Sequence, residues 1–159
     1  MIQIGDTVPK VALPVAGSTD GDEVSLGTFS GRWVVLYFYP KDNTPGCTRQ
    51  AQDFRERATD FDKASAVIIG VSKDSLKKHQ NFRAKHDLPF SLITDADEQL
   101  CRAFDVIKLK KMYGREFEGI ERSTFIIDPQ GRVAAQWRKV KVDGHVDDVL
   151  HQLNTLQTT

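Results

Sequence analysis

The stretch that decides the fold is Trp33-Val34-Val35-Leu36-Tyr37-Phe38-Tyr39-Pro40-Lys41-Asp42-Asn43-Thr44-Pro45-Gly46-Cys47-Thr48. Its first part, Trp33–Tyr39, is continuously apolar, which predicts a strand covered on both faces. Apolar residues then recur at helical spacing, which predicts a helix from Pro45 to about Phe61. We expect Thr44 to be its N-cap, with Pro45 at the first helical position.

This arrangement puts Cys47 in the first turn of a helix that follows a buried strand. Unpaired backbone N–H groups and the helix dipole favour an anion there. A thiolate is such an anion and is the reactive form of cysteine. Cys47 is therefore a candidate nucleophile.

Length, charge and cysteine count argue against several classes of protein. The 159 residues suffice for one domain with a substantial core, and we expect residues 1–159 to form a single domain. The 22 basic and 22 acidic residues cancel, which argues against a general nucleic-acid or membrane role. No apolar run could span a bilayer and the start lacks a signal-peptide pattern, so we expect a cytoplasmic protein. Two cysteines do not make a disulfide scaffold.

The remaining pattern predicts an α/β fold. After short strands or hairpins within residues 1–32, we expect strands and helices in the following order: strand Ala66–Ser72, helix Asp74–His86, strand Phe90–Ile93, helix Asp95–Phe104, a hairpin of Ser123–Ile127 with Val133–Trp137, and a final helix around residues 146–153. A βαβ pattern that ends in a hairpin and a helix predicts a thioredoxin-like three-layer sandwich with a central mixed sheet.

With these pieces assembled, the chain resembles the peroxiredoxins, and within them the bacterioferritin comigratory protein or Q-type group. The family signature of a proline, a threonine and a cysteine falls on Pro40, Thr44 and Cys47. Arg122, in Gly119–Asp128, matches the active-site arginine of the family. The likeness extends from Gly5 to the region of Arg138, so it covers nearly the whole chain.

The resemblance implies a peroxidase that reduces hydrogen peroxide and organic hydroperoxides. The Cys47 thiolate would attack the nearer peroxide oxygen and become a sulfenic acid, with no cofactor and no metal. Arg122 would stabilise the thiolate and orient the peroxide, and the Thr44 hydroxyl would bind it. Backbone N–H groups around Gly46 would complete the oxygen pocket. Pro40 would shield the sulfur without competing for hydrogen bonds.

Each of these residues also has a plainer interpretation. Cys47 could be an inert buried thiol, Thr44 only a helix cap, Arg122 a surface residue and Pro40 turn punctuation. The four histidines are His79, His86, His145 and His151. We interpret them as solvated or packing side chains, because none shows metal-ligand spacing with a cysteine. We interpret the basic run with Lys108, Lys110 and Lys111 as a solvated loop.

The chain departs from the family at the step that reduces the sulfenic acid. Many Q-type members carry a second cysteine five positions after the first, where this chain has Gln52. Others place it in the next helix, here about Asp74–His86, which has none. Cys101, beside core-like Leu100, Ala103 and Phe104, is the other thiol. We therefore expect a one-cysteine mechanism, although resolution by Cys101 after partial unfolding stays open.

The reductant would be thioredoxin, glutaredoxin or a small thiol, and by resemblance we expect a monomer. Other functions stay open: a peroxide sensor that passes oxidation to a partner, a thiol–disulfide oxidoreductase, a cysteine hydrolase or a binding module with an inert cysteine. The sequence alone does not indicate which peroxide is preferred, which reductant acts in the cell, or how easily Cys47 is over-oxidised.

Overall fold

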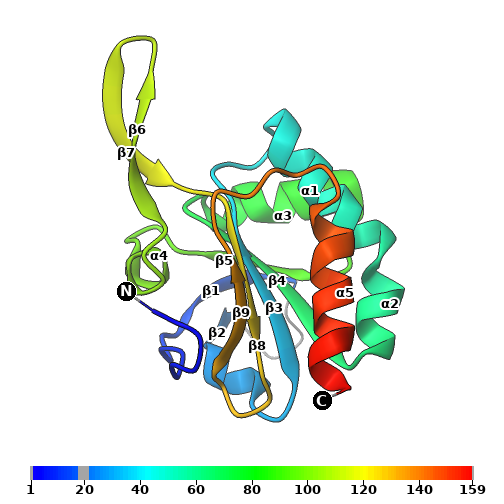
Figure 1. Cartoon of the computed structure of the whole chain (residues 1–159). Coiled ribbons are helices and arrows are strands. Elements are labelled where there is room, and N and C mark those ends of the chain that lie inside the picture. Colours follow the sequence, from blue (N-terminus) through cyan, green and yellow to red (C-terminus); the bar gives the residue numbers. More distant parts are fainter. Residues whose placement is uncertain (1, 18–21, 159) are drawn as a thin grey trace.

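The computed structural model describes residues 2–17 and 22–158. Its central sheet has the strand order β2-β1-β5-β4-β3-β8-β9, and β6 and β7 form a separate two-stranded sheet (Figure 1). The strands are β1 Leu13–Ala16, β2 Glu23–Val24, β3 Trp33–Phe38, β4 Ala66–Ser72, β5 Ser91–Thr94, β6 Ile107–Met112, β7 Arg115–Ile120, β8 Ser123–Ile127 and β9 Val133–Trp137. The helices are the 3-10 turn η1 Leu26–Phe29, α1 Pro45–Glu56, α2 Ala58–Lys63, α3 Leu76–His86, α4 Gln99–Ala103 and α5 His145–Gln157.

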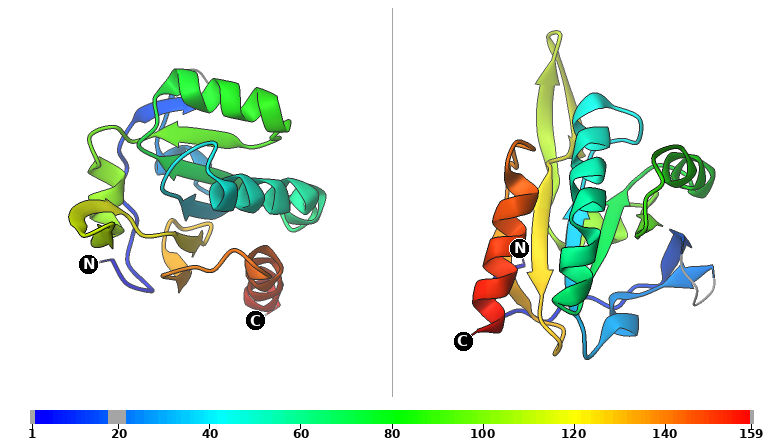
Figure 2. Two further views of the ribbon diagram at one scale, coloured as in Figure 1. Left: turned by 90° about the horizontal axis from the view of Figure 1, so that it is seen from above. Right: turned by 90° about the vertical axis from the view of Figure 1, so that its right-hand side faces the viewer.

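The central sheet is mixed. Strand β3 runs parallel to β4 and antiparallel to β8, and β4 runs parallel to β5. Two core clusters flank the sheet, because successive β3 side chains point to opposite faces: Val35 and Tyr37 belong to one cluster, Leu36 and Phe38 to the other. The first cluster includes side chains of α1, α2, α3 and α5, and the second includes α4 and the N-terminal segment (Figures 1 and 2). The predicted three-layer mixed-sheet sandwich is confirmed.

Most predicted elements are present within one or two residues, but the predicted helix from Pro45 to Phe61 is wrong in one respect. It breaks at Arg57, whose φ of −106° and ψ of 5° are not helical, into α1 and α2. The apolar spacing continues across this break, so periodicity alone does not reveal it. The predicted helix Asp95–Phe104 is shorter, beginning only after Glu98, which has a left-handed φ of 61°. The short strands predicted within residues 1–32 include β1 and β2, and residues 18–21 of that segment lie outside the described part of the chain.

The interpretation of the lysine run as a solvated loop is wrong. Lys108, Lys110 and Lys111 lie in β6, which pairs with β7 along its whole length. The resulting hairpin projects away from the body of the domain (Figures 1 and 2). It turns at Tyr113 and Gly114, both with positive φ, as a two-residue hairpin turn requires.

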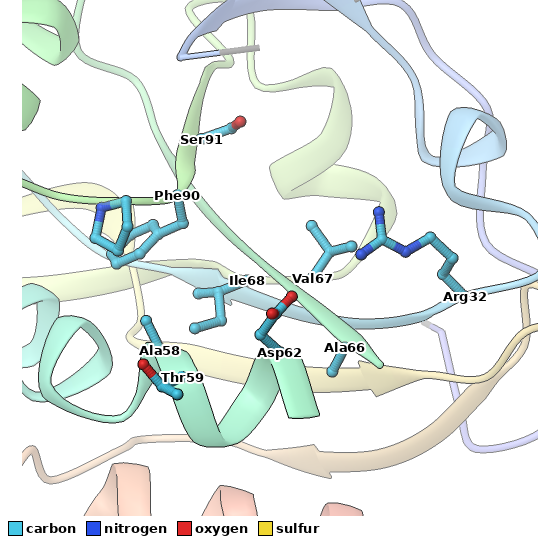
Figure 3. Close-up of a pocket in the computed structure, with 10 residues that line it drawn as sticks. Arg32, Ala58, Thr59, Asp62, Ala66, Val67, Ile68, Phe90 and Ser91 are labelled. Carbon is cyan, nitrogen blue, oxygen red and sulfur yellow. The ribbon is translucent and has the colours of Figure 1, made fainter. Parts of the chain in front are cut away.

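One cavity lies at the amino ends of the parallel strands, with a volume of about 400 Å³. Ala66 and Ser91, the first residues of β4 and β5, line it together with residues of α2 (Figure 3). Cys47 follows the carboxyl end of β3, at the opposite edge of the sheet. Ligand sites of open α/β sheets lie outside the carboxyl ends of the strands, so the chemistry is expected at the edge with Cys47.

Candidate active site

Cys47 lies where sequence analysis predicted, in the first turn of α1. The first helical hydrogen bond runs from the Thr48 N–H to the Thr44 carbonyl, at 2.9 Å. The N–H groups of Gly46 and Cys47 come before that bond and have no acceptor within the helix. The cysteine is only 2 % exposed. A thiolate here is shielded from bulk water and faces the positive end of the helix dipole.

Sheet register brings Arg122 to this helix end. Strand β8 is antiparallel to β3, and its first residue, Ser123, pairs with Phe38, the last residue of β3. Arg122 therefore lies just beyond the end of β3, beside the loop that leads to Cys47. Its Nη2 donates a hydrogen bond to Cys47 Sγ at 3.3 Å. The guanidinium supplies a permanent positive charge and a directed donor to the sulfur.

Gly46 is the residue that allows this approach. A Cβ added to Gly46 would lie 3.2 Å from Arg122 Nη2, which is closer than most side-chain contacts. A larger residue at position 46 would push the guanidinium away from the sulfur. The structure thus brings together Cys47, Arg122 and Gly46 of the predicted site.

Thr44 occupies the N-cap position, but its side chain makes no capping hydrogen bond. Its Oγ1 instead donates to the Lys41 carbonyl at 2.7 Å. A hydroxyl whose proton is used in this way keeps its lone pairs for accepting a hydrogen bond. The Thr44 hydroxyl therefore remains able to accept a hydrogen bond.

Pro40 lies in the loop after β3 and lines a cavity between that loop, α3 and the β6–β7 hairpin. It contributes no N–H donor to this opening. No contact of its ring with Cys47 is among the interactions of the described residues, so its shielding role stays a prediction.

Cys101 lies far from this arrangement in the fold. It is fully buried in the cluster on one face of the sheet, whereas Cys47 belongs to the cluster on the other face. The Cys101 backbone N–H donates to Asp95 Oδ2 at 2.7 Å. Burial raises the pKa of the Cys101 thiol far above its ordinary range, and the negative charge of Asp95 raises it further. Cys101 is therefore held as a neutral thiol.

Sequence analysis missed Gln50, which lies one helical turn after Cys47 and is fully buried. Its Oε1 accepts a hydrogen bond from Arg122 Nη1 at 2.6 Å. Arginine can only donate, so the amide oxygen must face it. Gln50 thereby fixes one arm of the guanidinium while the other arm reaches the sulfur. A polar residue on the buried face of α1, three positions after Cys47, was the available signal.

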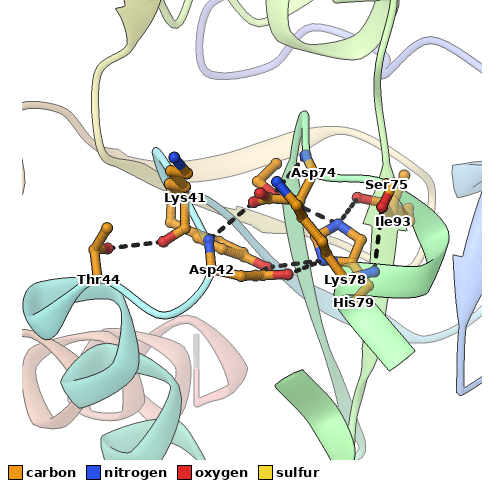
Figure 4. A network of polar contacts seen from close by, with 10 residues as sticks. Lys41, Asp42, Thr44, Asp74, Ser75, Lys78, His79 and Ile93 are labelled. Carbon is orange, nitrogen blue, oxygen red and sulfur yellow. Dashed lines mark hydrogen bonds and ion pairs between the residues drawn. The ribbon is translucent and has the colours of Figure 1, made fainter. Parts of the chain in front are cut away.

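A second missed feature is a buried polar network that holds the loop between β3 and α1 (Figure 4). His79 Nδ1 lies 2.7 Å from Asp42 Oδ2, and His79 Nε2 lies 3.1 Å from the Ile93 carbonyl. The Tyr39 hydroxyl donates to Asp42 Oδ1 at 2.6 Å, and the Asp42 N–H donates to Asp74 Oδ2 at 2.9 Å. The loop that carries Pro40 and Thr44 is thus fastened to α3 and β5.

Asp42, Asp74 and His79 offer three possible metal-ligand atoms within 4.8 Å of one another. Several of their polar atoms already have a protein partner: Asp42 Oδ2 pairs with His79, and Asp74 Oδ2 accepts from Asp42 N and from Ser72 Oγ. These hydrogen bonds join the active-site loop to α3 and β5, and we call the network the clasp.

Tyr37 lies on the same face of the sheet as Cys47. Burial raises the pKa of Tyr37 well above its ordinary value, and the negative charges of Cys47 and Asp42 raise it further. Its ring packs against Gly70 so closely that an added Cβ would be 2.9 Å from Tyr37 Cζ. Tyr37 is thus a neutral phenol near the thiol, and glycine at position 70 makes room for it.

A buried thiol at a helix N-terminus with a guanidinium on its sulfur suits the attack of a thiolate on a peroxide, and the comparisons agree with this chemistry. The model of the AhpC/TSA family matches residues 4–136. The chain belongs to the AhpC/TSA family. It is thus a peroxiredoxin, a thiol-dependent peroxidase that takes a hydroperoxide as substrate and a thiol as reductant.

Several similar proteins are named peroxiredoxins. The Xanthomonas campestris protein named Peroxiredoxin Bcp is 56% identical over 133 residues, which cover 84% of this chain and 83% of that protein. The Bacillus subtilis Peroxiredoxin Bcp is 50% identical over 155 residues, which cover 98% of this chain and 97% of that protein. A solved Xylella fastidiosa PrxQ mutant, at 43% identity, superimposes with a TM-score of 0.92 over 99% of this chain and 98% of that chain.

No helix in the described part of this peroxiredoxin is both long and apolar enough to cross a membrane.

Proposed function

We propose that this peroxiredoxin reduces hydrogen peroxide and organic hydroperoxides through a sulfenic acid on Cys47, and that an external thiol then reduces it. The observation that carries the first part is the hydrogen bond from Arg122 Nη2 to Cys47 Sγ at the N-terminus of α1. It joins a nucleophile with the group that can stabilise it and orient its substrate.

In the first step the Cys47 thiolate attacks the nearer oxygen of the hydroperoxide ROOH. The S–O bond forms as the O–O bond breaks, and the alkoxide or hydroxide leaves and takes up a proton. Arg122 carries N–H groups beyond the two already engaged, and these can donate to the developing negative charge. Thr44 accepts a hydrogen bond from the peroxide O–H, and the free N–H groups of Gly46 and Cys47 complete the oxygen pocket.

The second part rests on the position of Cys101. The two cysteines lie in core clusters on opposite faces of the central sheet, and Cys101 is fully buried and neutral. A disulfide needs Cα atoms within roughly 7 Å, so the pair could form only after major unfolding. An outside thiol needs only local access to Cys47, which is 2 % exposed, and does not need the two cysteines to meet.

A further observation supports the one-cysteine mechanism. The Xanthomonas campestris peroxiredoxin Q has been solved with serine in place of cysteine at its position 48 and, separately, at its position 84, an interval of 36 residues. The same interval from Cys47 ends at Arg83. The Arg83 side chain donates to the Phe90 and Leu88 carbonyls, so α3 offers a structural arginine there and no thiol.

The test is one equivalent of hydrogen peroxide added to the reduced protein, followed by a rapid quench and an intact mass. We expect a gain of one oxygen that maps to Cys47, absent from Cys47→Ser and retained in Cys101→Ser. A loss of two hydrogens would show a Cys47–Cys101 disulfide and refute the one-cysteine mechanism. An unchanged mass would refute the peroxidase role of Cys47.

A further inference from the structure

A cavity of about 410 Å³ opens beside the active-site loop and is lined by several lysines. It lies between the loop after β3, the N-terminal end of α3 and the β6–β7 hairpin. Its cationic side chains are Lys41 from the loop, Lys73 and Lys78 from around the start of α3, and Lys110 from β6. We call this cavity the lysine groove.

Most of the positive charge in the lysine groove is not neutralised. Lys73 is paired with Glu98 at 2.6 Å, but Lys41, Lys78 and Lys110 form no ion pair within residues 2–17 and 22–158. The side chains of Lys41 and Lys78 extend to the same side of the buried network (Figure 4). In a chain with no net charge, three unpaired cations around one cavity are a local site for an anion.

Two acidic residues, Asp74 and Glu118, also line the groove, so its four lysines outnumber its carboxylates by two. Asp74 is engaged by the Asp42 N–H and by the Ser72 hydroxyl. Glu118 is exposed and lies 3.7 Å from the guanidinium of Arg102. An incoming carboxylate therefore meets lysines whose positive charge is still available.

The groove borders the active-site loop. Pro40 of the active-site loop lines it, with the partly exposed ring of Phe117 from the hairpin. Lys110 lies over Gly119, where an added Cβ would be 3.4 Å from Lys110 Cδ. Burial lowers the pKa of Lys110, the charge of Arg122 lowers it further, and the negative charges of Cys47 and Glu121 act in the opposite direction. Lys110 is thus within electrostatic reach of both catalytic side chains.

We propose that the lysine groove binds the thiol that reduces Cys47, and that this thiol is a small molecule that carries carboxylates. The proposal rests on the proposed one-cysteine function. The volume of about 410 Å³ lies in the range of small-ligand sites. The lysines match the carboxylates, and Pro40 and Phe117 match an apolar stem.

The cations also favour the chemistry. The attacking group must be a thiolate, which lysines stabilise. The thiolate RS⁻ attacks the sulfur of the Cys47 sulfenic acid, the S–S bond forms, and hydroxide leaves and is protonated to water. A second molecule of the same thiol attacks the mixed disulfide, which gives RSSR and returns the Cys47 thiolate. Two thiols are oxidised for each peroxide reduced, so atoms and electrons balance.

The experiment measures the two half-reactions separately on the full-length protein. Cys47 is first oxidised with one equivalent of hydrogen peroxide, and its rate of reduction is followed with two probes. Glutathione carries two carboxylates, and its glycine monoethyl ester carries one fewer; each rate is corrected for the ionised fraction of the thiol. The variants are Lys41→Gln, Lys78→Gln and Lys110→Gln. The matched control is Lys111→Gln, which lies next to Lys110 on β6 and points to the other face, with 75% of its side chain exposed.

We expect the unmodified protein to prefer glutathione over its ester by roughly threefold to fivefold, the size of one exposed ion pair, and to lose this preference in high salt. At least one groove variant should lose the preference, whereas Lys111→Gln should keep it. Equal rates with both probes, or an equal loss in Lys111→Gln, would overturn the proposal. Failure of Cys47 to become oxidised would instead refute the proposed function itself.

A second arm tests whether the groove serves the peroxide. Oxidation is measured with a carboxylate-bearing hydroperoxide and with an uncharged one. We expect the groove variants to change the ratio of these two rates by less than twofold. If the variants slow oxidation by the carboxylated hydroperoxide and leave reduction unchanged, the groove is a peroxide site and the proposal is wrong.

Discussion

Replacing Arg122 with methionine tests the central contact of the site. The substitution removes a charged donor that lies 3.3 Å from Cys47 Sγ and keeps a side chain of moderate length. Hydrogen bonds to charged groups contribute about 1.5–3 kcal/mol. At about 1.4 kcal/mol for each factor of ten, the second-order rate of Cys47 oxidation should fall roughly tenfold to 150-fold. The reason is that both the thiolate and the charge on the leaving oxygen lose their donor.

Two further variants separate the charge from its geometry. Arg122→Lys keeps the charge, but one ammonium cannot reproduce the fork that contacts Cys47 Sγ and Gln50 Oε1 together, so its rate should be intermediate. Gln50→Leu removes the partner that fixes the guanidinium and should slow oxidation by a smaller factor. Because Gln50 acts through Arg122, adding Gln50→Leu to Arg122→Met should cause no further loss.

The assay is quenched-flow oxidation with hydrogen peroxide under pseudo-first-order conditions, read by intact mass. Arg49→Gln is the matched control, because Arg49 lies on α1 with Cys47 but its side chain is 56% exposed. That variant should stay within about twofold of the parent. If Arg122→Met is slowed no more than Arg49→Gln, the guanidinium does not stabilise the reacting sulfur and the reasoning is refuted.

Three further predictions concern the buried groups. Burial lowers the pKa of His145 to about 4, so between about pH 6.5 and 4 the unfolded chain binds a proton that the folded protein does not. Acidification through this window should lower the free energy of unfolding by about 3 kcal/mol. Urea titrations at each pH should show a smaller decrease for His145→Gln than for the parent protein. Asp42→Ala breaks a fully buried pair and should lower the unfolding free energy by about 3–5 kcal/mol, whereas Asp143→Ala, with its side chain 87% exposed, should change it by less than about 0.5 kcal/mol; equal effects would mean that the network is not a clasp. Both cysteines are buried, but a maleimide should label Cys47 before Cys101 in the folded protein, because Arg122 stabilises the thiolate of Cys47 whereas burial and Asp95 keep Cys101 neutral; peptide mapping that finds Cys101 labelled first would contradict this.

Local signals predicted the strand–loop–helix unit well. The strand is indicated by the apolar run Trp33–Tyr39, and the start of the helix by Pro45 at its first position. Both signals depend only on residues that are neighbours in sequence, so one stretch is enough to predict the unit. The hairpin at 107–120 was missed because its strands are mostly exposed and carry lysines in place of a clear apolar alternation. Gly114 was the available signal, since a glycine in a two-residue turn is typical of a hairpin.

The clasp around the active-site loop could not be predicted in the same way. Asp42 and His79 are 37 residues apart, and only the parallel pairing of β3, β4 and β5 brings their elements together. A buried aspartate and histidine look like ordinary polar residues until their partner is known, because burial of either one alone would be unfavourable. The helical pattern around His79 therefore suggested a solvated or packing residue.

Net charge, like local sequence pattern, does not reveal which side chains the fold brings together. A balance of 22 basic and 22 acidic residues excludes a molecule-wide attraction for polyanions, and that argument holds at distances beyond the screening length. A small ligand instead senses the charges within a few ångströms of it. Lys41, Lys78 and Lys110 come from three separate segments, and the fold gathers them around one cavity next to the active-site loop, where none of them forms an ion pair with another described residue. A neutral chain can thus carry a local cluster of cations, and only the placement of the hairpin reveals it.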